Sequence, residues 1–209
     1  MERPPEFVQS LERGLAVIRA FSDGNSRLTL SDVAKETGMS RAAARRFLIT
    51  LESLGYAHSD GKFFSLRPSV LQLGYAYLSG FTFSSIAQQH LESLAESVHE
   101  SCSASVLDEH DIVYVARAST NRIMTIGLTV GARLPAYCTS MGRVLLSELT
   151  PEAISQYLTT ADFSARTDRT LTNPTELLEE LAKVKLNGWC LLDQELELGV
   201  RSVAVPVRD

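Results

Sequence analysis

Three arginines stand close together in the first part of the chain, and no acidic residue interrupts the stretch that carries them. They are Arg41, Arg45 and Arg46, and neither Asp nor Glu occurs between Thr37 and Leu51. The arginine side chain is always charged, and its planar set of N–H donors suits phosphate oxygens and guanine edges. This composition and spacing indicate contact with a nucleic acid.

A helix is the element that would position these arginines. Ser40 is a good N-cap residue, the alanines after it favour a helix, and Gly55 is suited to end it. An α-helix of this kind fits the major groove of B-DNA. We expect one stripe of the helix to face a core, namely Ala44, Phe47, Leu51 and Leu54. We expect the opposite side to be exposed, namely Ala42, Arg45, Arg46 and Ile49.

The neighbouring segments predict a winged helix-turn-helix around this helix. Apolar residues at positions 11, 15, 18 and 21 indicate a first helix, and either Thr29 or Ser31 caps a second one. Gly38 ends the second helix, and Asp60-Gly61 forms a hairpin turn between residues 56–59 and 62–66. The competing interpretation is a three-helix bundle with a hairpin, whose arginines only solvate a surface. The predicted DNA-binding residues are Ser40, Arg41, Ala42, Arg45, Arg46, Thr50 and Lys62.

Charge is divided unevenly along the chain. The net charge of the 209 residues is −5, but residues 1–80 carry +2 and residues 81–209 carry −7. The local charge decides where a phosphate backbone can dock, so the acidic total does not exclude DNA.

The chain has no apolar run long enough to span a bilayer and no signal-peptide core near its start, which predicts a cytoplasmic protein. Three cysteines far apart predict reduced thiols and no zinc site.

The second part of the chain predicts a mixed α+β domain that is not an enzyme. Strands are expected at 102–107, 112–117, 122–126, 189–193 and 201–207, and helices at 86–100, 139–149, 151–158 and 174–186. It has no nucleophile elbow, no phosphate-binding glycine loop and no zinc-protease motif, so we expect neither a cofactor nor a metal. Cys138 is interpreted as a buried thiol, because no nearby base is indicated.

Several motifs resemble those of the IclR family of bacterial transcriptional regulators. They are the segments 7–15 (FVQSLERGL), 46–51 (RFLITL) and 54–56 (LGY). Segments 40–48 (SRAAARRFL) and 133–146 (RLPAYCTSMGRVLL) are similar to the branch that controls protocatechuate and β-ketoadipate genes. The resemblance implies a winged helix-turn-helix domain at 1–66, a linker helix at 67–80 and a GAF-like ligand-sensing domain at 81–209. Family members continue with a further strand and helix, so we expect this last domain to be incomplete.

The resemblance also implies an effector site, formed by the segment 137–142 and the segment 193–202. A helix N-terminus offers free N–H groups to a carboxylate, which suits an aromatic or dicarboxylic acid. Arg133 either supplies a cation to this site or pairs with an acid elsewhere, whereas Gly142 and Arg143 are expected to serve packing. The acids at 193, 195 and 197 are unfavourable beside an anionic effector, and they either hydrogen-bond hydroxyls, as on a catechol ring, or face water. The candidate effector residues are Met124, Arg133, Tyr137, Cys138, Thr139, Ser140, Met141, Asp193, Glu195 and Ser202.

These observations predict a regulator of aromatic-acid catabolism that binds a palindromic operator as a homodimer or homotetramer. The expected effector is protocatechuate, β-ketoadipate, 4-hydroxybenzoate or a related small carboxylate. The alternatives are a regulator of the same family that senses a different metabolite, an enzyme for small acids tethered to DNA, and a protein-interaction module that binds no small molecule.

Overall fold

A computed structural model describes residues 4–21, 25–80, 82–119 and 128–208. The chain divides into two compact units, Met1–Gly80 and Phe81–Asp209. Each is described by itself. Within the described residues, no helix is long and apolar enough to cross a membrane.

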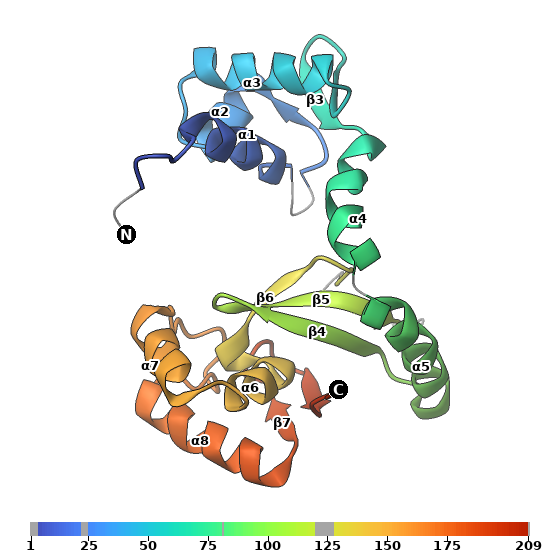
Figure 1. The fold of residues 1–209 in the computed structure, drawn as a ribbon, viewed down its shortest axis with the longest axis vertical. Helices are drawn as coiled ribbons and strands as arrows, with labels where there is room; N and C mark the ends of the chain where they lie inside the picture. Colours follow the sequence, from blue (N-terminus) through green and yellow to red (C-terminus); the bar gives the residue numbers. More distant parts are fainter. Residues whose placement is uncertain (1–3, 22–24, 81, 120–127, 209) are drawn as a thin grey trace. The chain divides into compact units, whose positions relative to one another are not determined.

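The first unit combines helices with a small antiparallel sheet (Figure 1). Its elements are α1 (Gln9–Arg19), β1 (Leu28–Thr29), α2 (Leu30–Glu36), α3 (Arg41–Ser53), β2 (Ala57–Ser59), β3 (Phe63–Leu66), the 3-10 turn η1 (Pro68–Val70) and α4 (Leu71–Gly80). The strand order is β1-β3-β2, with Thr29 opposite Phe63 and Ser59 opposite Phe64. The unit is therefore a helix-turn-helix followed by a two-stranded wing, as the sequence predicts.

The local signals for helix starts and turns act as expected. Thr29, and not Ser31, caps α2, and it forms a capping box in which the Asp32 carboxylate accepts from the Thr29 N–H. The Ser40 hydroxyl caps α3 by accepting from the Ala43 N–H at 3.2 Å. Gly38, in the turn between α2 and α3, has a φ of +65°, a left-handed conformation that glycine adopts without strain.

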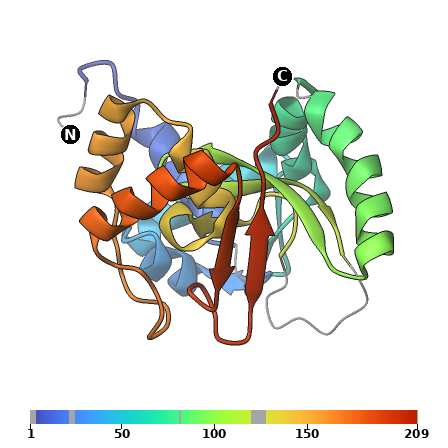
Figure 2. The same ribbon diagram turned by 90° about the horizontal axis from the view of Figure 1, so that it is seen from below.

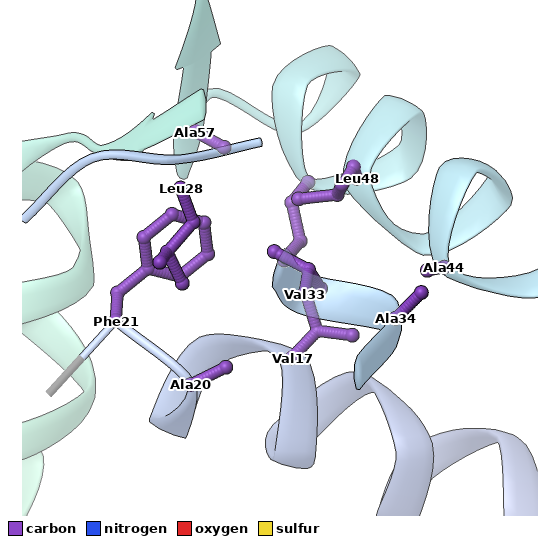
Figure 3. Close-up of a cluster of buried hydrophobic side chains, with 10 residues drawn as sticks. Val17, Ala20, Phe21, Leu28, Val33, Ala34, Ala44, Leu48 and Ala57 are labelled. Atoms are coloured by element: carbon purple, nitrogen blue, oxygen red, sulfur yellow. The ribbon is translucent and has the colours of Figure 1, made fainter. Parts of the chain in front are cut away.

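The core of the first unit lies where α1, α2 and α3 meet the sheet (Figure 3). Val17, Val33, Ala44 and Leu48 are fully buried there. The expected stripe of α3 is wrong at Leu54, which is 65% exposed, and it omits Leu48, which is fully buried. Phe47 is partly buried and packs against the core, as expected. Leu54 lies outside because α3 ends at Ser53 and the chain turns at Gly55. The stripe Ala44, Leu48 and Leu51 has the i, i+4, i+7 spacing of a single helix face.

The apolar face predicted for α1 is also partly wrong. The helix buries Val17 against the core, and Ala20 and Phe21 follow it there, but Leu11 and Leu15 are exposed. Leu11 and Leu15 are four residues apart and continue an exposed apolar strip that begins at Phe7 and Val8. Because residues four apart lie on one side of a helix, α1 has two apolar faces, only one of which the unit itself covers.

The second unit contains two antiparallel sheets flanked by helices (Figure 2). Its elements are α5 (Thr82–Val98), β4 (Cys102–Asp108), β5 (Asp111–Ala118), β6 (Arg133–Pro135), the 3-10 turn η2 (Ala136–Cys138), α6 (Ser140–Ser147), α7 (Pro151–Thr160), α8 (Pro174–Asn187), β7 (Cys190–Asp193) and β8 (Arg201–Ala204). One sheet has the order β4-β5-β6, and β7 pairs with β8 in the other. Both views show α5 at one end of the unit and α7 with α8 at the other. Helix α6 lies between, in contact with α8, β4, β7 and β8.

Most of the predicted elements of the second unit are found. The strands at 102–107 and 112–117 form a hairpin that turns at 108–111, and the helices expected at 151–158 and 174–186 begin after the N-caps Thr150 and Asn173. Gly188, in a left-handed conformation, ends α8. The strand expected at 122–126 lies outside the described residues, and the described third strand of that sheet is instead β6. Helix α5 buries Ala95, while Leu94 and Val98 are half exposed. The buried face of α5 is the one that contacts β4 and β5, although larger apolar side chains lie elsewhere on the helix.

Candidate functional site

All seven residues predicted to contact DNA are exposed in the first unit. These are Ser40, Arg41, Ala42, Arg45, Arg46, Thr50 and Lys62. Within the described part of the chain, no acidic side chain forms an ion pair with the three arginines of α3. Their guanidinium groups are therefore open to an external anion.

The two hydroxyl groups at the ends of this surface are partly used by the helix itself. The Ser40 oxygen accepts the capping hydrogen bond, which leaves its O–H free to donate. The Thr50 hydroxyl donates to the Arg46 carbonyl at 2.8 Å. Thr50 is thus less available as a donor to a phosphate than the sequence alone suggests.

The tip of the wing is ordered by Asp60. Its Oδ1 accepts from the backbone N–H groups of Lys62 at 3.0 Å and Phe63 at 2.7 Å, and its Oδ2 pairs with Arg27. These contacts, above all the hydrogen bond from the Phe63 N–H, hold the pKa of the Asp60 carboxyl below its usual value. The contact of Arg27 with the wing was not predicted from the sequence, because Arg27 is 33 positions from Asp60 and belongs to no local motif.

In the second unit, the segment 137–142 comprises the end of η2, the N-cap of α6 and its first residues, and most of it is packed into the interior. Tyr137, Cys138, Thr139 and Ser140 are all buried. Thr139 is the N-cap, because its hydroxyl accepts from the Gly142 N–H at 3.2 Å. A Cβ at Gly142 would lie 2.1 Å from the Ala136 carbonyl oxygen, so this position admits only glycine. The packing role expected for Gly142 is confirmed.

Cys138 is a buried thiol. Desolvation raises its pKa to about 11, so the group is protonated at neutral pH and is a poor nucleophile. Its sulfur lies 3.8 Å from the Pro135 carbonyl oxygen. These contacts agree with the packing interpretation of this residue.

Arg133 is held at the β4–β5 turn. Its Nη1 lies 2.5 Å from Asp108 Oδ2, and its Nε lies 3.1 Å from Asp111 Oδ2. The hydrogen bond to Asp108 is the main reason that the pKa of the guanidinium is raised. Of the two roles expected for Arg133, the structure therefore favours an ion pair with acids and not a cation that binds the effector.

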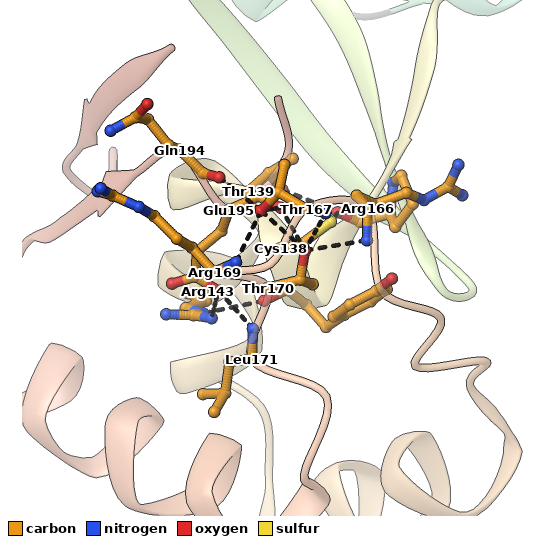
Figure 4. A network of polar contacts seen from close by, with 12 residues as sticks. Cys138, Thr139, Arg143, Arg166, Thr167, Arg169, Thr170, Leu171, Gln194 and Glu195 are labelled. Atoms are coloured by element: carbon orange, nitrogen blue, oxygen red, sulfur yellow. Dashed lines mark hydrogen bonds and ion pairs between the residues drawn. The ribbon is translucent and has the colours of Figure 1, made fainter. Parts of the chain in front are cut away.

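A buried ion pair connects α6 to the segment 193–202 (Figure 4). Arg143 Nη2 lies 2.5 Å from Glu195 Oε2, and the two side chains are only 3% and 13% exposed. Arg143 Nε also donates to the Tyr137 carbonyl at 2.9 Å, and the Glu195 carboxylate accepts from the Leu171 N–H at 3.0 Å. The structural role expected for Arg143 is confirmed, and Glu195 is compensated by charge.

The loop at residues 164–171, which was not predicted from the sequence, contacts both predicted effector segments, 137–142 and 193–202. Within residues 164–171, the Thr167 hydroxyl donates to the Gln194 carbonyl at 2.7 Å and the Thr170 hydroxyl donates to the Glu195 carbonyl at 2.6 Å. The Tyr137 hydroxyl donates to the Ser164 carbonyl. The hydroxyl groups and arginines of this loop are the only feature of the sequence that could have predicted these contacts. Polar loop residues are common, however, and they do not indicate which residue is the partner.

Two arginines compensate Asp193. Arg169 Nη1 lies 2.8 Å from its Oδ2, and Arg201 Nε lies 2.6 Å from its Oδ1. The hydrogen bond from Arg201 is the main cause that lowers the pKa of the Asp193 carboxyl. Glu197 differs, because its Oε2 is buried without a hydrogen-bond partner among the described residues.

The structure brings together only some of the candidate effector residues. Met141 contacts β4, where the Ser105 hydroxyl lies 3.4 Å from its sulfur, so Ser105 is a neighbour that sequence reasoning did not find. Ser202 is exposed on β8, and Met124 lies outside the described residues. An apolar cavity of about 430 Å³ lies elsewhere, between α7 and α8, and is lined by Ile154, Leu158, Leu181 and Lys185 among others.

Comparison with known proteins gives matches over both units. The family model for the bacterial transcriptional regulator IclR C-terminal domain matches residues 75–209, and the IclR helix-turn-helix model matches residues 10–61. The Pca regulon regulatory protein of Pseudomonas putida is 48% identical over 206 residues, which cover 98% of this chain and 71% of that protein.

Two solved structures are also similar. A transcriptional regulator from Rhodococcus sp. RHA1 is 54% identical with a TM-score of 0.83, over 97% of this chain and 81% of that one. The inducer-binding domain of the PobR transcription factor from Acinetobacter, a double mutant in complex with 3-hydroxybenzoic acid, is 38% identical with a TM-score of 0.56. That match covers 59% of this chain and 73% of the other chain.

Proposed function

Because the chain belongs to the IclR family of bacterial transcriptional regulators, we propose that it regulates aromatic-acid catabolism genes in response to a small aromatic carboxylate. The winged helix-turn-helix binds the operator, and the second unit binds the effector. The observation that carries this proposal is the exposed face of α3, where three arginines have no acidic partner among the described residues.

Operator binding places α3 in the major groove of DNA. Arg41, Arg45 and Arg46 supply the charge and the donors, and the Ser40 hydroxyl donates to the backbone. Lys62 contacts DNA from the wing. Among the described residues these arginines have no acidic partner, which supports this assignment, since no ion pair has to break before they meet a phosphate.

The regulator acts as a homodimer or a dimer of dimers. The exposed strip of Phe7 and Val8, which precede α1, and Leu11 and Leu15, which lie on it, supports self-association, because contiguous exposed apolar side chains mark interaction surfaces. A two-fold axis would present two copies of α3 to the two halves of a palindromic operator.

The effector is an aromatic acid that binds near the start of α6 and the segment 193–202. PobR, one of the similar proteins, was solved with 3-hydroxybenzoic acid. Two of the three acids that are unfavourable for an anion do not act as free charges, since Arg143 compensates Glu195 while Arg169 and Arg201 compensate Asp193. Glu197 has no such partner among the described residues. Met141 and Ser105 supply an apolar surface and a hydroxyl at this place.

The second unit is a sensor and not a catalyst. The thiol that most resembled a nucleophile, Cys138, is protonated and buried. The similar proteins are named as regulators, which agrees with a sensing role. Turnover of protocatechuate or 4-hydroxybenzoate by the purified chain would contradict this part of the proposal.

A thermal-shift titration tests the effector class. A ligand that binds only the folded chain stabilises it by about 2.7 kcal/mol when its concentration is 100 times its Kd. We expect 3-hydroxybenzoate, 4-hydroxybenzoate or protocatechuate to raise the Tm, and phenol, which lacks the carboxylate, to leave it unchanged. A shift with aliphatic dicarboxylates alone would assign a different effector, and no shift with any acid would contradict the sensor.

A further inference from the structure

Arg27 lies at the tip of the wing, although it is far from the wing in sequence. It precedes β1, which pairs with β3, and its guanidinium pairs with Asp60 of the hairpin turn. The guanidinium carbon also lies 4.9 Å from the centre of the Phe63 ring, and Lys62 Nζ lies 5.1 Å from the same ring centre. The wing therefore carries two cations beside one aromatic ring.

We propose that Arg27 is a DNA-contacting residue, and that Arg27 and Lys62 together bind the phosphate backbone beside the groove that α3 enters. This inference rests on the proposed operator binding and adds a contact to it. The partner is the polyanionic backbone of duplex DNA, since phosphate oxygens receive most of the hydrogen bonds that arginine and lysine side chains make in protein–DNA complexes.

The contacts of Arg27 restrict its position without using all of its donors. The side chain is 61% exposed, and Asp60 accepts from one guanidinium nitrogen. A guanidinium has five N–H donors, so donors remain for a phosphate oxygen while the ion pair persists. The Phe63 ring attracts both cations through its π face, which reduces the conformational freedom that DNA binding would otherwise remove.

The charge at the wing tip stays positive in the presence of Asp60. Arg27 and Lys62 contribute two positive charges and Asp60 contributes one negative charge. The Asp60 carboxylate is also occupied by two backbone N–H groups of the turn, and its pKa is lowered accordingly. Asp60 therefore stays ionised at neutral pH and serves to hold Arg27 at the tip.

The hairpin follows α3 directly, so both groups of cations can meet one duplex. Strand β2 contacts α3, and the Ser59 N–H donates to the Glu52 carboxylate of α3 at 3.2 Å. Figure 1 shows the hairpin at the C-terminal end of α3. The recognition helix and the wing therefore form one connected body within the first unit.

The test is the salt dependence of binding to a short mixed-sequence duplex, measured by fluorescence anisotropy with the full chain. Each phosphate contact contributes about 0.9 to the slope of log K against log salt concentration. We expect Arg27→Gln to flatten the slope by about 0.9. The matched control is Arg19→Gln, which removes the same charge at the end of α1 in the same unit, and it should keep the wild-type slope.

A third variant separates this inference from the proposed function. Arg45→Gln should flatten the slope if α3 binds DNA, and an unchanged slope for Arg45→Gln would contradict operator binding by α3 itself. If Arg45→Gln flattens the slope but Arg27→Gln binds as the wild type does, Arg27 does not contact DNA and the inference is overturned.

A measurement on the wild-type chain guards against a variant that fails to fold. Phenylglyoxal modifies exposed arginines, and mass spectrometry reports the extent of modification at each position. We expect the duplex to slow modification at Arg27 relative to Arg19. Equal rates at Arg27 with and without the duplex would also overturn the inference.

Discussion

Arginine has opposite roles on helix α3 of the first unit and in the second unit, whereas Arg27 of the first unit is paired with Asp60. In the first unit, Arg41, Arg45 and Arg46 lie on an exposed helix face with no acidic partner among the described residues. In the second unit, five arginines form ion pairs with acids of the same unit, namely Arg133, Arg143, Arg169, Arg201 and Arg208. The same side chain is available to an external anion in one unit and stabilises loops in the other.

This difference shows that an arginine's role depends on the acids that the fold brings near it. Among the described residues, the arginines of α3 form no ion pair with an acid, although Glu52 lies in the last turn of the same helix. Glu195 is 52 residues from Arg143 in sequence, yet the two side chains share a buried hydrogen bond. Changes on the two sides of this comparison should therefore have different effects: loss of stability in the second unit, and loss of DNA binding in the first.

The largest effect is expected from Arg143→Met, which leaves Glu195 partly buried without its cation. Breaking such a pair costs about 3–5 kcal/mol, because the remaining charge is not solvated. Urea unfolding of the full chain would measure the change in the free energy of unfolding. The control is Arg169→Met, whose pair with Asp193 is about half exposed and should contribute at most about 1 kcal/mol. Equal losses from the two variants would contradict the distinction between buried and exposed pairs.

Gly142→Ala should be the next most destabilising change. The added Cβ would meet the backbone of Ala136, which cannot move as the end of a flexible side chain can. Overpacking of this kind costs about 1–3 kcal/mol. Gly74→Ala in α4 is the matched control, because no heavy atom lies within 4 Å of its Cβ position, and alanine there should stabilise the helix by about 0.5–1 kcal/mol. In thermal unfolding, we expect Gly142→Ala to lower the Tm and Gly74→Ala to raise it. An unchanged Tm for Gly142→Ala would contradict the close approach of Gly142 to the Ala136 backbone.

Arg46→Ala should leave the fold nearly unchanged but weaken DNA binding. An exposed side chain without a partner contributes within about 0.5 kcal/mol to stability. The loss of one phosphate contact should lower affinity and flatten the salt slope by about 0.9. Calorimetry and anisotropy on the same preparation would measure both quantities. A large loss of stability with unchanged DNA affinity would place Arg46 with the structural arginines of the second unit.

The sequence predicted the exposed side of α3 because that side depends only on helical spacing. Arg45 and Arg46 are exposed by the same periodicity that buries Ala44 and Leu48. The limits of this argument appear at the helix end, where Leu54 lies beyond the last helical residue and is exposed. Caps were also predictable, since Ser40 and Thr29 act on backbone groups within three residues.

The candidate effector site was less predictable because its contacts are distant in sequence. Arg133 was assigned to either of two roles, and the acids that settle its contacts, Asp108 and Asp111, are more than 20 residues away. The loop at 164–171 gave no periodic signal, although its hydroxyls bind the carbonyls of Gln194 and Glu195. Periodicity reports which face is buried, but it does not report which distant residue is the partner.

The smallest effect should appear in the pH dependence of stability at Asp193. Its carboxyl pKa is lowered in the folded chain, mainly by the hydrogen bond from Arg201, so the folded state favours the ionised form. The contribution is therefore fully present above the unfolded pKa, about 3.9, and is lost as the pH falls through the lower folded pKa. Asp193→Asn keeps an oxygen acceptor but removes the charge, so the wild type should be more stable than this variant at neutral pH and should lose that advantage in acid. Arg201→Gln removes the main cause of the shift and should reduce the same difference, whereas an unchanged pH profile in Arg201→Gln would show that Arg169 alone compensates Asp193.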